Sequence, residues 1–219
     1  MKQDATESAA TADPREGSPV DSVQVAALFV DPSGPYPGLV GAEHCWDAER
    51  DAMTYVGPHP VVAHPPCQLW VNFAALNFKR YGGEHNRPGN DGGKFAFALS
   101  VVRAFGGVLE HPAASKAWAE YNLARPVRHG WDYMGSGEWV CEVWQSAYGH
   151  AARKRTWLFW KGVGTPPELR GEQPTGSHQI GWFDRIKPTL SKRDASRTPD
   201  AFALELVRLA QVSGSTWQP

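Results

Sequence analysis

The sequence predicts an α/β protein with a mostly parallel sheet. Short apolar runs rich in β-branched residues, each stopped by proline or glycine, are typical of strands that are buried on both faces. They alternate along the chain with segments whose apolar residues recur at the helical period. With 219 residues, of which 42% are hydrophobic, the chain is long enough for one domain with a substantial core.

Each predicted element has its own signal. The first strand is the apolar run SVQVAALFVD, and the second, PVVAHPPC, ends at Pro65 and Pro66 because proline cannot donate to a sheet ladder. The first helix presents Phe95, Leu99, Val102 and Phe105 on one face and stops at a glycine pair, and the last helix is amphipathic. The predicted strands are residues 22–31, 60–67, 107–112, 138–149 and 155–162, and the predicted helices are residues 91–106 and 198–211.

Composition separates a tail from a domain. Residues 1–21 contain no Ile, Leu or aromatic residue, which predicts a disordered N-terminal tail, and residues 22–219 are expected to form a single catalytic domain. No segment has the apolar length of a signal peptide or a membrane span. Three cysteines at irregular spacing do not suggest a disulfide framework, so a cytoplasmic location is expected. The formal charge of −1 does not by itself indicate a nucleic-acid-binding protein, but basic residues can still gather on one face.

Two chemistry-bearing residues, Cys67 and Glu110, come at or just after the ends of predicted strands. In parallel sheets the working residues lie at the carboxyl ends of strands. Two prolines stiffen the turn before Cys67, and a rigidly held nucleophile loses less entropy on reaching its reactive geometry. Cys67 can equally be a buried apolar residue in a plain loop, and Glu110 can be a helix-capping or salt-bridging carboxylate.

Four short motifs occur in the order found in one enzyme family. They are PPCQ at residues 65–68, LEHP at 109–112, YGHAARKRTWLF at 148–159 and LSKRDASRTPDAFALELVRLA at 190–210. Together they resemble the cytosine-5 DNA methyltransferases, although His111 replaces the asparagine of that family's Glu-Asn-Val strand end and an alanine replaces the glutamine before Arg-x-Arg. The resemblance implies a reduced Rossmann-like methyltransferase sheet, mostly parallel, in a three-layer arrangement.

The resemblance also implies a catalytic set of Cys67, Glu110, Arg153 and Arg155. A thiolate that adds to carbon 6 of a pyrimidine makes carbon 5 reactive, and the base must leave the helix stack to be reached. Glu110 would bond the ring edge with a raised pKa, and the arginines would hold the ring oxygen or a phosphate and favour the thiolate. The alternative for residues 153–155 is a solvated basic turn. Further residues expected to contact the base are Pro65, Pro66, Gln68, His111 and Tyr148, and those expected to contact double-stranded DNA are Lys79, Arg80, Arg87, Lys154, Lys192 and Arg193.

Two departures from the family limit what the resemblance implies. The family's glycine-rich loop for S-adenosylmethionine is here LFVDPSGPYPGL, in which prolines remove amide donors, and the segment from Gly38 to the cysteine loop supplies at most one helix. The family's large target-recognition domain is reduced to residues 161–188, which form a loop at most, with Trp182, Arg185 and Lys187 as possible DNA contacts. We therefore expect no cofactor, no metal and low sequence specificity.

These features lead to one expected function and two alternatives. The expected function is a transferase that replaces pyrophosphate on an activated 5-hydroxymethyluracil in DNA by an amine or amino acid, as in phage thymine hypermodification. The amine would be held by Asp31, Ser33, Gly34 and Tyr36. The alternatives are an S-adenosylmethionine-dependent cytosine-5 DNA methyltransferase, and a non-catalytic relic of that fold that binds DNA or a partner protein. Residues 86–95 are read either as a loop that closes over DNA or as a plain helix-entry turn.

Overall fold

The protein is described from a computed structural model that covers residues 23–127, 130–181 and 186–214. The predicted tail, residues 1–21, lies outside these residues, as do Trp182 and Arg185. Among the described residues, no helix combines the length and the apolar character needed to cross a membrane.

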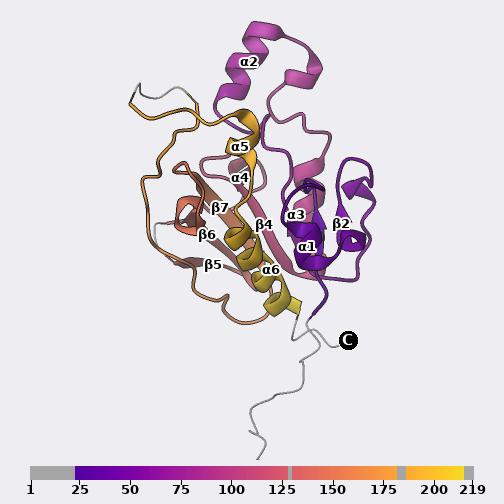
Figure 1. The fold of residues 1–219 in the computed structure, drawn as a ribbon. Helices are drawn as coiled ribbons and strands as arrows, with labels where there is room; N and C mark the ends of the chain where they lie inside the picture. Colours follow the sequence, from indigo (N-terminus) through magenta and orange to yellow (C-terminus); the bar gives the residue numbers. More distant parts are fainter. Residues whose placement is uncertain (1–22, 128–129, 182–185, 215–219) are drawn as a thin grey trace, which may run out of the picture.

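A single sheet of seven strands forms the centre of the molecule, with the order β2-β1-β3-β4-β7-β6-β5 (Figure 1). The strands are β1 (Ala26–Leu28), β2 (Cys45–Trp46), β3 (Val61–Ala63), β4 (Gly107–Pro112), β5 (Trp131–Gly135), β6 (Glu138–Trp144) and β7 (Arg155–Lys161). The α-helices are α1 (Tyr36–Val40), α2 (Phe73–Tyr81), α3 (Lys94–Phe105), α4 (Lys116–Glu120), α5 (Lys192–Ser196) and α6 (Asp200–Gly214). Short 3₁₀ helices occupy Ala42–His44, Ala52–Thr54, Glu84–Asn86 and Gln145–Tyr148.

The α/β class is confirmed, but the sheet is mixed. Strands β2, β1, β3 and β4 run parallel, as expected, whereas β7 pairs antiparallel with β4 and the pairs β7–β6 and β6–β5 are also antiparallel. Connection length explains the difference, because a parallel crossover needs about a dozen residues or more. A tight turn at Ser136 and Gly137, both with positive φ, joins β5 to β6, and residues 145–154 join β6 to β7.

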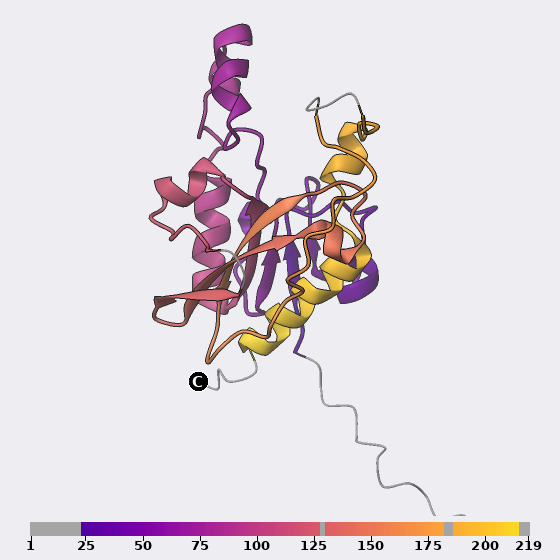
Figure 2. The same ribbon diagram turned by 90° about the vertical axis from the view of Figure 1, so that its left-hand side faces the viewer.

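Helices cover both faces of the sheet, which gives three layers. Helix α3 packs on β3 and β4 from one side, and α6 packs on the same strands from the other side (Figures 1 and 2). Side chains alternate accordingly along β4, where Leu109 belongs to the core under α3 and Val108 to the core under α6. The predicted apolar face of the first helix is confirmed, since Phe95, Leu99 and Val102 are buried and Phe105, at the end of the helix, is partly buried against the same core.

The sequence patterns did not indicate β2, β5 and the four shorter helices. Strand β2 has two residues and pairs only at one edge, so it has no periodic signal to read. Helix α2 projects away from the sheet and buries only Ala74, while its apolar residues Phe73, Leu76 and Tyr81 are exposed (Figure 2). The hydrophobic patterns of the sequence therefore predicted the main strands and helices of the core but not the short elements at the periphery.

Candidate active site

A cleft of about 1530 Å³ opens at the edge of the sheet where β1, β3 and β4 end. Because β7 is antiparallel to β4, its first residue lies at this same edge, and the end of β6 lies beside it. The cleft is lined by residues that follow β1, β3 and β4, by residues 153–155, by the start of α2 and by residues 192–198. Cys67 and Glu110 both line it, and this is the edge at which open α/β sheets place their ligands.

Cys67 lies in a short turn after β3. Pro65 is buried in front of it, and the Cys67 carbonyl accepts a hydrogen bond of 2.9 Å from the Trp70 amide, which closes the turn. The thiol is half-buried. Burial, together with the negative charge of Glu110, raises the pKa of Cys67, while Lys154 acts in the opposite direction. Lys154 is therefore the neighbouring cation that favours the thiolate form of Cys67, although burial also lowers the pKa of Lys154.

Glu110 is buried, and one hydrogen-bonding side chain lies at each of its two carboxylate oxygens. Gln145 Nε2 donates to its Oε1 at 2.9 Å, and His64 Nδ1 lies 3.2 Å from its Oε2. Burial alone raises the pKa of this carboxyl, but the hydrogen bond with His64, and the positive charges that His64, Lys154 and His111 carry when protonated, outweigh burial and lower it to about 2. The expectation of a raised pKa at Glu110 is therefore wrong, because that expectation counted burial and not the donors around the group.

The cation that acts on both Cys67 and Glu110 is Lys154 and not an arginine. Lys154 acts electrostatically on both Glu110 and Cys67, and its Nζ donates to the Ser196 carbonyl at 3.2 Å. Arg155 instead forms a two-pronged ion pair with Glu142, at 2.6 and 3.2 Å, and the Arg153 guanidinium lies 3.9 Å from the Trp144 ring centroid. Both arginines line the cleft, but the assignment of a thiolate-stabilising role to them is corrected in favour of Lys154.

Two residues expected to contact the base have structural roles. His111 is 0% exposed, its Nδ1 lies 2.7 Å from Ser115 Oγ, and its ring stacks on Trp118. Burial lowers the pKa of His111 to about 4, although Glu110 and the Pro66 carbonyl act in the opposite direction. The ring is therefore neutral, and its contact with Pro66 supports the turn that holds Cys67. Tyr148 is not among the cleft residues: it packs on Phe202 of α6, and its hydroxyl accepts from the Arg170 amide.

The segment after β1 lines the same cleft, as expected for an amine site. Asp31, Ser33, Gly34 and Tyr36 all contribute to its wall. Asp31 Oδ1 accepts from the Ser33 amide at 2.8 Å, and the Asp31 carbonyl accepts from the Gly34 amide at 2.9 Å. These amides are therefore already used within the loop and do not form a free nest for an anionic ligand.

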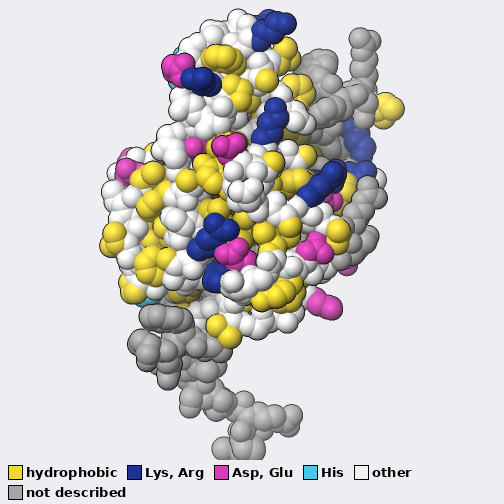
Figure 3. Space-filling model, turned by 180° about the vertical axis from the view of Figure 1, so that it is seen from behind, with side chains coloured by type: hydrophobic (Ala, Val, Ile, Leu, Met, Phe, Trp, Pro, Cys, Tyr) yellow, Lys and Arg dark blue, Asp and Glu magenta, His cyan; other side chains and the backbone are white. Residues whose placement is uncertain are grey.

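Cations expected to contact DNA gather at this end of the molecule in two groups. Arg153, Lys154, Arg155, Lys192 and Arg193 line the cleft. Lys79 and Arg80 lie in the last turn of α2, an arm that rises at the same end of the sheet as α5, and Arg87 follows it and pairs with Glu84 (Figures 1 and 2). On the face opposite α6, by contrast, Lys and Arg side chains are scattered among acidic ones (Figure 3).

Two other segments have plain structural roles. The Asp91 carboxylate accepts from the Phe95 amide and from Trp70 Nε1, both at 2.9 Å, so the turn before α3 is a helix entry. Residues 162–181 and 186–191 contain no helix or strand between β7 and α5, in agreement with the expected loop. Lys187 in this loop donates to the carbonyls of Thr175 and Gly176.

Sequence reasoning missed the two side chains that hold Glu110, which are His64 and Gln145. His64 directly follows β3, and this position at a strand end is the signal that marks it. Gln145 directly follows β6. Its place beside Glu110 could not be predicted from the sequence, because it depends on the antiparallel pairing that brings this end of β6 to the cleft edge. Within the part of the chain that the structure describes, no group of three or more His, Cys, Asp or Glu residues is arranged to hold a metal ion.

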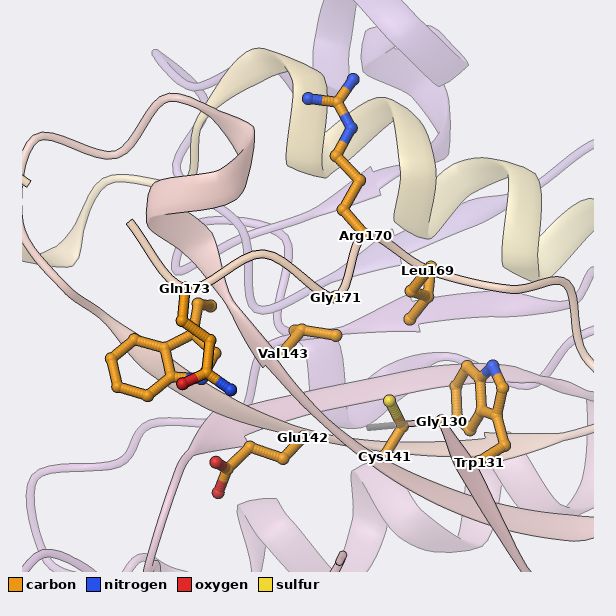
Figure 4. Close-up of a pocket in the computed structure, with 10 residues that line it drawn as sticks. Gly130, Trp131, Cys141, Glu142, Val143, Leu169, Arg170, Gly171 and Gln173 are labelled. Atoms are coloured by element: carbon orange, nitrogen blue, oxygen red, sulfur yellow. The ribbon is translucent and has the colours of Figure 1, made fainter. Parts of the chain in front are cut away.

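A second cavity lies on β6, away from the cleft, and measures about 20 Å³. It is bounded by Trp131, Cys141, Leu169 and Arg170 (Figure 4). A space of this size holds about one water molecule, so it is not a site for a substrate.

Glu110 should make stability depend on acid. Its pKa is lowered from 4.5 to about 2 on folding, so its stabilising effect is complete above about pH 4.5 and is lost as the pH falls toward 2. We expect the free energy of unfolding of the wild-type protein to fall through this window more steeply than that of Glu110→Gln. Urea titrations at several pH values measure the difference. If the free energy of unfolding fell equally with pH in both proteins below pH 4.5, the prediction would be wrong.

Two comparisons with known proteins give no match for this chain. A scan of the sequence against protein-family models finds no match, and a search of curated proteins finds none either.

Proposed function

We propose that the protein is a DNA base-modifying transferase that works through a thiolate adduct of Cys67 at carbon 6 of a flipped pyrimidine. In the proposed reaction, an amine or amino acid replaces pyrophosphate on an activated 5-hydroxymethyluracil. The observation that carries the proposal is the half-buried Cys67 thiol in a large cleft, beside an acceptor carboxylate and the half-buried cation Lys154. The α/β sheet with helices on both faces is compatible with a reduced Rossmann-like methyltransferase fold.

The reaction consists of two displacements on an allylic system. The thiolate bonds to carbon 6, the ring double bond shifts to the exocyclic carbon, and pyrophosphate leaves with its electron pair. The amine nitrogen then bonds to the exocyclic carbon, the double bond returns to the ring, and the thiolate leaves carbon 6 as the nitrogen loses a proton. No oxidant, reductant or methyl donor takes part, and the cations beside Cys67 favour both the thiolate and the leaving pyrophosphate.

The state of Glu110 supports a uracil-type base over cytosine. A carboxylate that already accepts from Gln145 and His64 can only accept, and the N3–H of uracil is a donor. Cytosine carries a lone pair at N3 and would need a protonated acid, which the lowered pKa of Glu110 disfavours.

The loop after β1 does not fit S-adenosylmethionine. The Ser33 and Gly34 amides donate within the loop, and Pro32 and Pro35 have none to offer. We therefore derive no step through that donor and expect no specific binding of it. Its binding in a thermal-shift assay, together with methyl transfer to unmodified cytosine, would favour the methyltransferase alternative.

DNA binding should depend on the cations at the cleft. Lys192 and Arg193 line the cleft at the start of α5, and each phosphate contact contributes roughly one unit to the slope of log K against log salt. We expect Lys192→Gln with Arg193→Gln to lower this slope by about two units in fluorescence anisotropy. Arg208→Gln, an exposed cation on α6 outside the cleft, is the control and should leave the slope unchanged. Equal slopes for all three proteins would argue against a DNA role for this edge.

The function is tested by the mass of modified nucleosides. DNA from cells that express the protein together with an enzyme pathway for pyrophosphorylated hydroxymethyluracil should contain a thymidine derivative heavier by the added amine. Cells without the pathway, or with Cys67→Ser, should lack this nucleoside. A methylated cytosine in both settings would overturn the proposal.

A further inference from the structure

Five side chains from five separate segments form a continuous hydrogen-bonded chain that begins at the cleft and runs into the core. Tyr36 Oη lies 2.6 Å from His64 Nε2, and His64 Nδ1 lies 3.2 Å from Glu110 Oε2. Gln145 Nε2 donates to Glu110 Oε1 at 2.9 Å and to Thr156 Oγ1 at 2.9 Å. Tyr36, His64 and Glu110 all line the cleft that contains Cys67, and Tyr36, which is 2% exposed, lies in the cleft wall.

The chemistry of each group gives this chain a direction. The amide nitrogen of Gln145 can only donate, and an ionised Glu110 can only accept, so His64 Nδ1 carries a proton. In the neutral ring, His64 Nε2 is then an acceptor, and Tyr36 donates its O–H to it. The lone pairs of Tyr36 Oη remain to accept a hydrogen bond from a molecule in the cleft.

We propose that Tyr36 is a catalytic residue that receives the proton of the incoming amine and passes its own proton to His64. The proposal rests on the proposed function and adds the group that completes its second displacement. As nitrogen bonds to the exocyclic carbon and the Cys67 sulfur leaves carbon 6, the N–H proton moves to Tyr36 Oη. The phenol proton moves at the same time to His64 Nε2, which leaves an imidazolium next to the Glu110 carboxylate.

Two observations fit Tyr36 to this role. Burial, with Glu110 and Cys45, raises the pKa of Tyr36 well above its ordinary value, so the phenol keeps its proton and acts only as a relay. Tyr36 also belongs to the same loop and first helical turn as Asp31 and Ser33, the cleft wall that we expect to hold the amine. His64 is only partly buried, so water can take the proton from the imidazolium afterwards.

The test separates adduct formation from adduct release. Wild-type protein is incubated with duplex DNA that carries pyrophosphorylated 5-hydroxymethyluracil, without amine, and the covalent complex is isolated; glycine is then added. We expect Tyr36→Phe to form the adduct at the wild-type rate but to release it about a hundredfold more slowly, the usual scale of general-base catalysis. His64→Gln should show the same defect. Tyr55→Phe is the control, because Tyr55 is equally buried and donates to the His59 carbonyl outside the cleft.

The outcomes distinguish the relay from the proposed function. An adduct that Tyr36→Phe releases as fast as wild type would overturn the relay and leave the Cys67 chemistry in place. The absence of any adduct on the wild-type protein would overturn the proposed function, and the role of Tyr36 with it. Slow release in Tyr36→Phe and His64→Gln, with normal release in Tyr55→Phe, supports the proposal.

Discussion

Replacing Cys67 by serine should abolish the covalent complex with DNA that carries an activated 5-substituted pyrimidine. A serine hydroxyl in this position lacks the nucleophilicity of a thiolate, and Lys154 assists a thiolate but cannot ionise an alcohol at neutral pH. We expect product formation to fall by at least about a thousandfold, since the covalent route is lost entirely. Denaturing gel electrophoresis of labelled DNA measures the complex, and mass spectrometry of nucleosides measures the product.

The control for this variant is Cys45→Ala. Cys45 is also a free thiol, but it is buried in β2, outside the cleft, and burial raises its pKa to about 11. This substitution should leave adduct formation intact. If Cys67→Ser retained product formation at the wild-type rate, Cys67 would not be the nucleophile and the thiolate mechanism would be wrong.

Replacing Glu110 by glutamine should reduce turnover by about a hundredfold or more while DNA binding survives. The new amide would turn a donor toward either Gln145 or His64, both of which already donate to this position, so one contact becomes repulsive. The base would lose its acceptor at the ring edge, and the Tyr36–His64 pair would lose its counter-charge. Single-turnover rates and anisotropy on the same duplex separate the two effects.

Glu138→Gln is the matched control for the Glu110 variant. Glu138 is also held in an ion pair, with Arg103 at 2.9 Å, but it lies at the start of β6, at the opposite end of that strand from Gln145. It should lower neither turnover nor DNA affinity. Undiminished turnover in Glu110→Gln would show that the carboxylate only supports the fold.

The fold could be predicted where burial leaves a pattern in the sequence. The strand of residues 107–112 is observed with the predicted bounds, and the helix of residues 91–106 is observed as α3 with the predicted buried face. Both lie in the core, where packing dictates apolar spacing. Helix α2 was not predicted; it projects from the sheet, buries only Ala74 and leaves Phe73 and Leu76 exposed, so it is not part of the core on which the sequence prediction was based.

By itself, the sequence determined which residues follow the strand ends of the parallel part of the sheet. It placed Asp31, Cys67 and Glu110 at the carboxyl ends of β1, β3 and β4, because apolar runs stopped by prolines mark those ends. Only the tertiary structure decided what surrounds them. The antiparallel pairing of β7 with β4 and β6 brings Gln145 and Lys154 to the same edge, although in sequence they follow Glu110 by more than thirty residues. The ionisation of a buried carboxyl depends on the donors that the fold assembles around it, and these donors come from strands whose direction no local pattern specifies.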